Sequence, residues 1–237
     1  LVFPFEIIIF LCMCGRFIQT ADPEKIRAIL PDIQVDDAAA DGFRPRYNIA
    51  PTQDVLTVLN TPPPRLTTTR WGLIPPWAKD AGIGNRMINA RAETLESKPS
   101  YRDPFRKRRC IIFADGFYEW KGTGKTRIPY LIRFESGEPF AMAGLWDRWR
   151  DTRTGRDLLS STIVTTAANA LIAGIHDRMP VILEPGACGL WLSPAPAPGT
   201  ELAACLRPFD DARMEAYEVS RLVNNPSNES SECIRPV

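Results

Sequence analysis

The fold is decided by residues 110–121, which read Cys110-Ile111-Ile112-Phe113-Ala114-Asp115-Gly116-Phe117-Tyr118-Glu119-Trp120-Lys121. The apolar first four residues and the aromatic-rich last five are each typical of a β-strand. Because side chains alternate along a strand, Glu119 is expected on the same face as Phe117. Tyr118 and Trp120 then lie on the opposite face. This stretch therefore predicts two strands and places a carboxylate among large aromatic rings.

The regions on either side also contain strand patterns. We predict strands at residues 55–59, 110–113, 117–121, 130–134, 140–145 and 158–165. A helix is predicted to begin at Pro23, because Asp22 is a favourable capping residue, and to end before Pro31. Helices are also predicted at residues 166–175 and 200–206. Without repeats or strand–helix alternation, a doubly wound parallel fold is disfavoured and one β-rich α+β domain is expected.

The charge balance gives no general argument for nucleic-acid binding. Lysine and arginine number 29, aspartate and glutamate number 28, and the net charge is +1. Any basic site must therefore be local. The run Arg106-Lys107-Arg108-Arg109 is predicted to be a solvated turn before a strand, because such runs are only weakly specific for nucleic acid.

The six cysteines are scattered along the chain and include no C-x-x-C pair. Zinc-type spacing is therefore absent, and a disulfide framework is not expected at this length. No metal or cofactor is expected, and a reducing compartment such as the cytoplasm fits best.

Residues 1–12 are apolar but match neither a signal peptide nor a membrane span. They lack a basic n-region, contain Glu6 and show no small-residue cleavage site. They are also shorter than the roughly 20 apolar residues that a transmembrane helix needs. We expect residues 1–12 to be an upstream segment that the mature protein lacks, and residues 13–237 to form the domain.

Met13-Cys14-Gly15-Arg16-Phe17 contains a methionine directly followed by cysteine. If translation begins at Met13 and that residue is removed, Cys14 carries an α-amine and a thiol on adjacent carbons. Such an aminothiol condenses with an aldehyde to an imine, and the thiol then closes a thiazolidine ring. An α-amino group has a pKa of about 7.7–8.0, so part of it is unprotonated at neutral pH.

Two further side chains are candidates for acid–base chemistry. Burial of Glu119 among aromatic rings would raise the pKa of its carboxyl group, although a surface glutamate on an edge strand is the alternative. His176 is the only histidine and lies on a predicted loop, where functional residues concentrate, although a lone histidine is often structural. Residues 122–126 lack the spacing of a phosphate-binding loop and are predicted to form a hairpin turn.

Arg70-Trp71-Gly72-Leu73-Ile74-Pro75-Pro76-Trp77 places tryptophans beside an arginine. This combination suits stacking on unpaired bases together with phosphate contacts. Core packing with a separate surface charge is the alternative.

Several motifs occur in an order typical of one family. They are Met13-Cys14-Gly15-Arg16-Phe17, Tyr47-Asn48-Ile49-Ala50-Pro51, Arg70-Trp71-Gly72-Leu73-Ile74-Pro75, Asn89-Ala90-Arg91-Ala92-Glu93-Thr94, Asp115-Gly116-Phe117-Tyr118-Glu119-Trp120 and His176-Asp177-Arg178-Met179-Pro180, with Val223-Asn224 and Cys233-Ile234 near the end. From Met13 nearly to Val237 the chain resembles the SRAP family (SOS response-associated peptidases, also called abasic-site processing proteins). One departure is Phe113, where the family usually has proline.

The resemblance implies an α+β fold, a single β-rich domain with a barrel-like antiparallel core and flanking helices. It also implies a covalent thiazolidine crosslink between Cys14 and the ring-opened aldehyde of an abasic site in single-stranded DNA. By the same resemblance, Asn89 holds the reactive amine, Glu119 helps open the sugar and His176 assists at the same centre.

Four further residues are DNA-contact candidates because they lie in the matching motifs. Arg16, Arg91 and Arg178 are candidates for phosphate contacts, and Trp71 is a candidate for base stacking. We expect a monomer that acts on DNA in the cytoplasm, associated with the nucleoid, without membrane, metal or cofactor.

Two other functions stay open. The first is a thiol peptidase or autopeptidase with Cys14 as nucleophile, His176 as base and Asn89 as orienting residue. The second is a module that only binds single-stranded DNA. Only a crosslinking protein would form an adduct with abasic DNA that survives denaturation.

Overall fold

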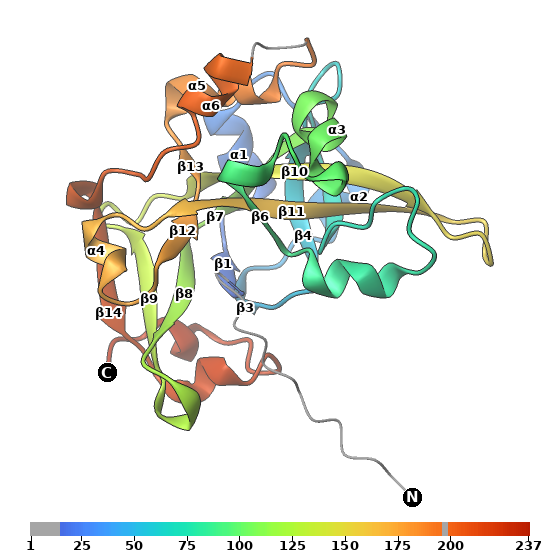
Figure 1. Ribbon diagram of the computed structural model, residues 1–237. Coiled ribbons are helices and arrows are strands. Elements are labelled where there is room, and N and C mark those ends of the chain that lie inside the picture. The colour runs from blue at the N-terminus through green and yellow to red at the C-terminus, as the bar shows by residue number, and fades with distance from the viewer. Residues whose placement is uncertain (1–14, 196–198) are drawn as a thin grey trace, which may run out of the picture.

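The two strands predicted within residues 110–121 belong to two different sheets (Figure 1). The computed structural model describes residues 15–195 and 199–237. The predictions for residues 1–12, Met13 and Cys14 concern residues outside these ranges. β7 (Arg109–Ala114) lies in the larger sheet and β8 (Gly116–Lys121) in the smaller one, so the chain passes between the sheets at Asp115.

Five strands of the larger sheet close into a barrel. In spatial order they are β11 (Asp157–Ala167), β10 (Phe140–Arg150), β7, β4 (Asp54–Leu59) and β5 (Arg65–Trp71). These neighbours are antiparallel, and a short parallel pairing between β5 and β11 closes the ring. Four short strands extend the sheet, namely β2 (Gln34–Val35), β6 (Asn89–Arg91), β12 (Arg178–Pro180) and β13 (Ile182–Leu183). The predicted barrel-like antiparallel core is thus confirmed.

The smaller sheet lies against this barrel. Its order is β14 (Met214–Glu218), β9 (Ile128–Phe134), β8, β1 (Phe17–Gln19) and β3 (Arg46–Ile49), all antiparallel. Phe17, Phe117 and Ile132 of this sheet share one buried apolar cluster with Ile112 and Ile163 of the barrel. Burial of this shared surface joins the two sheets.

Five of the described helices cover the other face of the barrel strands, namely α1 (Pro23–Ile29), α2 (Asp37–Asp41), α3 (Pro99–Lys107), α5 (Pro185–Leu192) and α6 (Gly199–Ala204). The short helix α4 (Ala170–Ala173) packs instead in the cluster that joins the two sheets, through Ile172. Short 3₁₀ helices are η1 (Ala81–Arg86), η2 (Ala92–Thr94), η3 (Gly124–Thr126), η4 (Asp211–Arg213), η5 (Arg221–Asn224) and η6 (Ser231–Ile234). Ile26, Phe105 and Trp191 pack in a second cluster with Val58 and Ala143. Within the described ranges, no helix has both the length and the apolar character needed to cross a membrane.

Most sequence predictions of secondary structure are confirmed. Every predicted strand is present, although β10 and β11 continue past residues 145 and 165. Asp22 caps α1, since its carboxylate accepts a hydrogen bond from the amide of Lys25 at 2.8 Å. The hairpin turn predicted at residues 122–126 joins β8 to β9.

The helix predicted at residues 166–175 is wrong over most of its length. β11 continues to Ala167 because Thr166 pairs with Met179 of β12. Only Ala170–Ala173 is helical, and it begins where the side chain of Asn169 caps the amide of Ile172. The pairing with β12 therefore prevails over the local helical pattern.

The basic run at residues 106–109 also differs from its prediction as a solvated turn. Arg109 is fully buried. Its guanidinium donates to the carbonyl oxygens of Phe105 and Arg106 at the end of α3, and to those of Trp191 and Ser193 at the end of α5. A positive charge is favourable beside such helix C-termini, so Arg109 joins α3 and α5 to the barrel.

Replacing Arg109 should destabilise the fold. Hydrogen bonds to charged groups contribute roughly 1.5–3 kcal/mol each, and Arg109→Met would leave several carbonyl oxygens unsatisfied. We expect the free energy of unfolding to fall by at least about 3 kcal/mol in urea denaturation. The exposed neighbour is the control, since Arg106→Met should change stability by less than about 0.5 kcal/mol. Equal effects of both changes would contradict this role of Arg109.

Candidate active site

Gly15, the first described residue, lies opposite Glu119 on the neighbouring strand. β1 and β8 are antiparallel, and Phe17 is paired with Phe117. Following this register for two more residues toward the N-terminus places Gly15 across from Glu119. The candidate nucleophile Cys14 is outside the described residues.

The pairing of β1 with β8 continues past the N-terminal end of β1. The amide of Tyr118 donates to the carbonyl oxygen of Arg16 at 2.9 Å. Gly15 itself is half-buried. Residues 15 and 16 therefore run alongside β8, and Gly15 reaches the level of Glu119.

Glu119 is buried, with 3% of its surface exposed. Phe117, on the same face of β8, is completely buried. The alternative of a surface glutamate on an edge strand is therefore wrong, because β8 lies between β1 and β9.

Asn89 begins β6, where it is paired with Ile163 of β11. The preceding carbonyl group, that of Ile88, accepts hydrogen bonds from the amide of Ile163 and the indole of Trp71, both at 3.0 Å. The hydroxyl of Tyr101 donates to the carbonyl oxygen of Asn89 at 3.2 Å. The backbone that carries Asn89 is thus held by three different elements.

His176 lies between α4 and β12, on the loop that the sequence predicted. Its Nδ1 accepts a hydrogen bond from the amide of Arg178 at 3.1 Å and lies 3.0 Å from a carboxylate oxygen of Asp177. Both contacts of Nδ1 are therefore with the residues that follow in the same loop, and the side chain of His176 is 21% exposed.

One apolar cluster brings these segments together. It contains residues adjacent to, or a few positions from, Asn89, Glu119 and His176, together with one residue of β1. These cluster members are Phe17, Ile88, Phe117, Ile172 and Met179. The three predicted site residues therefore lie around a shared core, on β6, β8 and the loop before β12.

Arg178 is held by the protein rather than directed to solvent. Its guanidinium donates to both carboxylate oxygens of Glu93, at 2.6 and 2.9 Å, and to the carbonyl oxygen of Thr165 at 2.7 Å. The hydrogen bonds from Arg178 hold the pKa of the Glu93 carboxyl group below its usual value. Since the Arg178 side chain is 12% exposed, this ion pair joins β12 to η2 beside the site.

Arg16 and Arg91 differ in their surroundings. Nη1 of Arg16 donates to Asn48 and to the carbonyl oxygen of Val223, both at 2.7 Å, and burial lowers the pKa of Arg16. Arg91, at the end of β6, is exposed and forms no ion pair within the described part of the chain. Of the three arginine candidates for phosphate contacts, Arg91 is therefore the most accessible.

Trp71 is not positioned for base stacking. It is completely buried, packs edge-on against Phe17 at 5.0 Å between ring centroids, and donates its indole proton to Ile88. No ring face is available to a nucleotide, so the prediction of stacking by Trp71 is corrected. Trp71 instead links β1 to the segment that carries Asn89.

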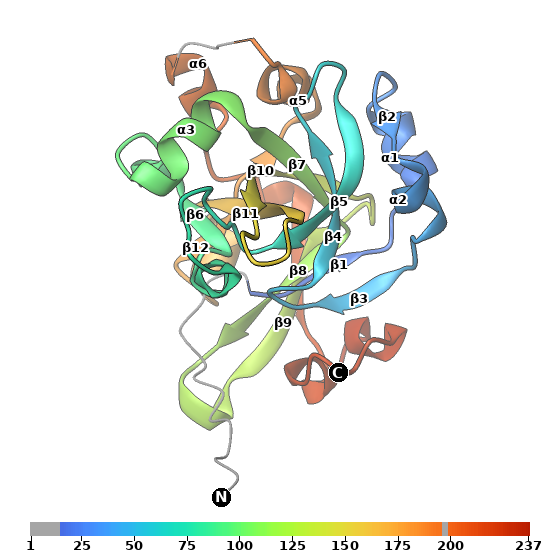
Figure 2. The same ribbon diagram turned by 90° about the vertical axis from the view of Figure 1, so that its right-hand side faces the viewer.

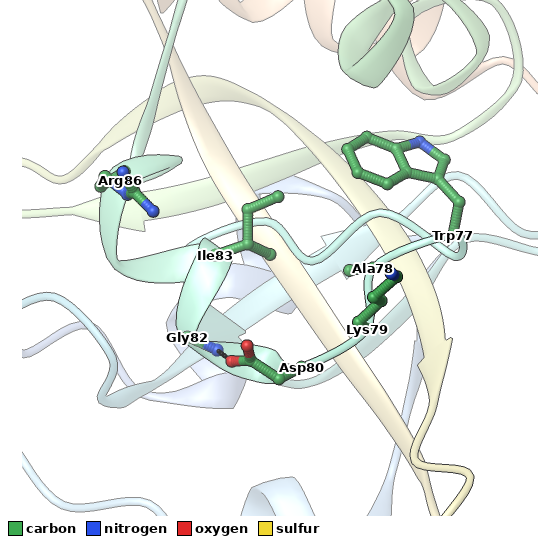
Figure 3. A pocket seen from close by; sticks show the side chains of 7 residues that line it. All are labelled: Trp77, Ala78, Lys79, Asp80, Gly82, Ile83 and Arg86. Atoms are coloured by element: carbon green, nitrogen blue, oxygen red, sulfur yellow. Dashed lines mark hydrogen bonds between the residues drawn. The ribbon is translucent and has the colours of Figure 1, made fainter.

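The exposed tryptophan of the same motif is Trp77, with 62% of its surface accessible. It borders a hollow of about 570 Å³, whose other lining side chains include Lys79, Ile83 and Arg86 (Figure 3). Asp80 caps the amide of Gly82 inside this hollow. An aromatic face beside two cations has the character of a nucleotide-binding surface.

Two glycines hold this hollow close to the segment that carries Asn89. A Cβ atom on Gly72 would lie 2.5 Å from the carbonyl oxygen of Gly84, and one on Gly84 would lie 2.6 Å from that of Gly72. Gly72 also has a positive φ of 124°. Side chains at these positions would separate the motif after β5 from η1.

The described cysteines are poorly suited to nucleophilic chemistry. Burial raises the pKa of the thiols of Cys110, Cys188, Cys205 and Cys233. In residues 15–195 and 199–237, no three His, Cys, Asp or Glu side chains form a group that could hold a metal ion.

Comparison with known proteins identifies close relatives. Residues 13–226 match the family described as SOS response associated peptidase (SRAP). Abasic site processing protein YoqW of Bacillus subtilis is 48% identical, over 94% of this chain and 99% of its own length. Abasic site processing protein YedK of Escherichia coli is 33% identical, over 95% of this chain and 100% of its own. A crystal structure of a Bacteroides thetaiotaomicron protein, 30% identical, covers 94% of this chain and 100% of its own with a TM-score of 0.83.

The structural role of Trp71 can be tested against Trp77. Trp71→Phe removes the indole hydrogen bond to Ile88 and leaves a cavity, so the free energy of unfolding should fall by about 2 kcal/mol. Trp77→Phe should change it by less than about 0.5 kcal/mol because Trp77 is exposed. Chemical denaturation of both variants provides the measurement, and equal stability of the two would refute the buried role of Trp71.

Proposed function

Because the chain belongs to the SOS response-associated peptidase (SRAP) family, we propose that it processes abasic sites in DNA and does so by bonding covalently to them. Its relatives YoqW and YedK are named abasic site processing proteins. The reactive group is the aminothiol of Cys14, exposed after Met13 is removed. The substrate is an abasic site in single-stranded DNA.

The reaction joins the deoxyribose aldehyde to Cys14 in two steps. The α-amine adds to the aldehyde carbon, and loss of water gives an imine. The sulfur then adds to the imine carbon while the imine nitrogen takes up a proton, which closes the thiazolidine ring. The reaction releases one water molecule and needs no oxidant or reductant.

The observation that carries this proposal is the position of Gly15 opposite buried Glu119. Consecutive Cα atoms are about 3.8 Å apart, so the proposed nucleophile is one covalent step from the residue that faces Glu119. Glu119 is buried on the same face of β8 as Phe117, and in this proposal its carboxyl group acts in the protonated form. This combination supports Glu119 as the acid that acts beside the N-terminal amine.

Glu119 is needed because an abasic sugar is mostly a closed hemiacetal. Opening the ring breaks the bond between C1′ and the ring oxygen, which must receive a proton. Glu119 supplies that proton and becomes a carboxylate, and the C1′ hydroxyl releases its own proton to water as the aldehyde forms. The same carboxyl group transfers protons in the opposite direction when the crosslink is reversed.

Asn89 and His176 assist at the same centre. Asn89 orients the amine from a backbone held by Trp71 and Tyr101. In this proposal His176 donates a hydrogen bond from Nε2 to the oxygen that leaves as water, since the contacts of its Nδ1 are with Asp177 and Arg178. Neither role requires a metal.

In this proposal DNA contacts Arg91 and the hollow that Trp77 borders. Trp77 offers a ring face on which an unpaired base can stack, and Lys79 and, across the hollow, Arg86 are available for phosphate contacts (Figure 3). Arg178 contributes indirectly through its ion pair with Glu93. Such local positive charge suffices for binding although the net charge is only +1.

The thiol peptidase alternative has less support in the geometry, because it gives no role to the buried carboxyl group of Glu119 opposite Gly15. A module that only binds DNA would have no use for a buried glutamate opposite the N-terminal segment.

The first test is the adduct itself. A chain that starts at Met13 should lose that methionine and form an adduct with an abasic single-stranded oligonucleotide that survives a denaturing gel. A chain with one uncleavable residue ahead of Cys14 should bind the oligonucleotide but form no stable adduct, because its nitrogen is an amide. Equal adduct yields would exclude the thiazolidine mechanism.

Cys14→Ser is the matched control for the sulfur step. Its amine remains, so borohydride should trap a transient imine, while no adduct should survive denaturation without the reductant. Cleavage of a peptide substrate by the native chain, without DNA adducts, would instead favour the peptidase.

Glu119→Gln separates chemistry from binding. Glutamine keeps the shape of the side chain but cannot transfer a proton, so crosslinking should slow by about 10²–10⁴-fold. Reversal of a preformed crosslink should slow as well, with little change in DNA affinity. Single-turnover rates on an abasic oligonucleotide measure both directions, and unchanged rates would reduce Glu119 to a structural residue.

A further inference from the structure

We propose that the C-terminal segment, residues 219–237, is a clamp that positions the reactive N-terminus, with Asn48 as its central positioning residue. The clamp supplies no reacting group. It acts through its contacts with Arg16 and with Tyr118 and Trp120, the two sequence neighbours of Glu119. This inference rests on the proposed function, because it concerns the position of Cys14 during crosslinking. Figures 1 and 2 both show the C-terminal turns beside β1 and β3.

The N-terminal strand needs support from outside its own sheet. β1 contains three residues, and its pairing with β3 is irregular between Phe17 and Gln19. Beyond it, one backbone hydrogen bond, from Tyr118 to Arg16, continues the pairing with β8. Chain ends usually fray unless they are tied down, so this short strand alone is a weak anchor for the residue that reacts.

Asn48 supplies the missing anchor. It is completely buried in β3, and its Oδ1 accepts the hydrogen bond from Nη1 of Arg16 at 2.7 Å. Its Nδ2 donates to the carbonyl oxygens of Val223, Asn225 and Asn228, at 3.2, 3.0 and 2.8 Å. One amide therefore connects the residue after Gly15 to three points of the C-terminal segment.

Arg16 also contacts the clamp directly. The same Nη1 atom donates to the carbonyl oxygen of Val223 at 2.7 Å, and the guanidinium lies 5.8 Å from the ring centroid of Trp120. The side chain of Arg16, two residues after Cys14 in the sequence, is thus fixed against the C-terminal segment.

Glu229 fastens the segment to β3 a second time. One carboxylate oxygen accepts from the amides of Tyr47 and Asn48, and the other accepts from Nε and Nη2 of Arg46. These hydrogen bonds join the carboxylate of Glu229 to the backbone amides of Asn48 and of the residue before it. They keep Asn48 in the orientation that its amide contacts require.

The clamp also touches both sequence neighbours of Glu119. The hydroxyl of Tyr118 donates to the carbonyl oxygen of Cys233 at 3.4 Å, and its ring packs with Val223 and Cys233. The indole of Trp120 donates to the side chain of Asn224 at 2.7 Å. The C-terminal segment therefore contacts the side chains of both residues that flank Glu119 in β8.

Positioning matters because the amine must approach the aldehyde in one geometry. A displacement of about 1 Å at a reacting centre can slow a reaction about 10²-fold. We therefore expect loss of the clamp to lower the maximal crosslinking rate, whereas DNA binding, which depends on Arg91 and the hollow that Trp77 borders, should be retained.

The test compares three variants of the chain that starts at Met13. Asn48→Asp places a carboxylate against three carbonyl oxygens, and Glu229→Gln removes the charge that holds β3. Both should slow crosslinking at saturating abasic oligonucleotide by about 10–100-fold, with unchanged affinity for the oligonucleotide. Glu215→Gln is the matched control, because Glu215 on β14 then loses its ion pair with Arg133 on β9, and this variant should crosslink at the native rate.

A small soluble aldehyde such as glyoxylate reports whether the N-terminal aminothiol is intact. All variants should form the glyoxylate thiazolidine at the native rate, since that reaction needs no positioning. Native crosslinking rates in folded Asn48→Asp and Glu229→Gln, or a loss of affinity at an unchanged maximal rate, would overturn the clamp. If Asn48→Asp does not fold, Glu229→Gln decides alone. Absence of any adduct with the native chain would instead reject the proposed function.

Discussion

The pairing of β1 with β8 is the constraint on which the candidate site depends. Strand register is fixed by which side chains are buried, and a slip of one residue turns a strand's side chains to the opposite face. Phe17 is buried in the cluster that joins the two sheets and Ile18 in the cluster on the opposite face, so a slip of one residue would exchange these side chains between two packed clusters. Burial of Phe17 opposite Phe117 thus fixes the register that places Gly15 opposite Glu119. The geometry of the site is a consequence of core packing two residues away.

The sequence predicted the long strands well because their signal is local. Apolar and β-branched runs made β4, β7 and β11 recognisable, and these strands form most of the barrel. Short strands such as β6 and β12 depend on a neighbour and carry little pattern of their own. The false helix at residues 166–175 shows the same limit, since a pairing with residues about ten positions later decides that segment.

The candidate site was predicted unevenly for a similar reason. Strand alternation placed Glu119 on the face of Phe117 but left burial and a surface position both open, whereas the loop position of His176 followed from its neighbours. By contrast, Trp71 and Trp77 lie in the same short motif, and the sequence does not show which of them is buried. Only the fold shows that Trp71 is in the core and Trp77 is on the surface. Arg109 was missed because a buried arginine depends on carbonyl oxygens from helix ends far along the chain.

A nucleophile at a chain end combines a chemical advantage with a mechanical difficulty. Only a terminal residue has an α-amine, yet termini are the least constrained part of most folds. A buried amide such as Asn48 is tolerated only when its hydrogen bonds are made, because an unsatisfied buried polar group is costly. Its four hydrogen-bond partners lie on Arg16 and the C-terminal segment. Moving either Arg16 or that segment would therefore leave a buried group of Asn48 without a partner. The polar interior thus holds the two ends of the described chain together more firmly than three residues of β-pairing could.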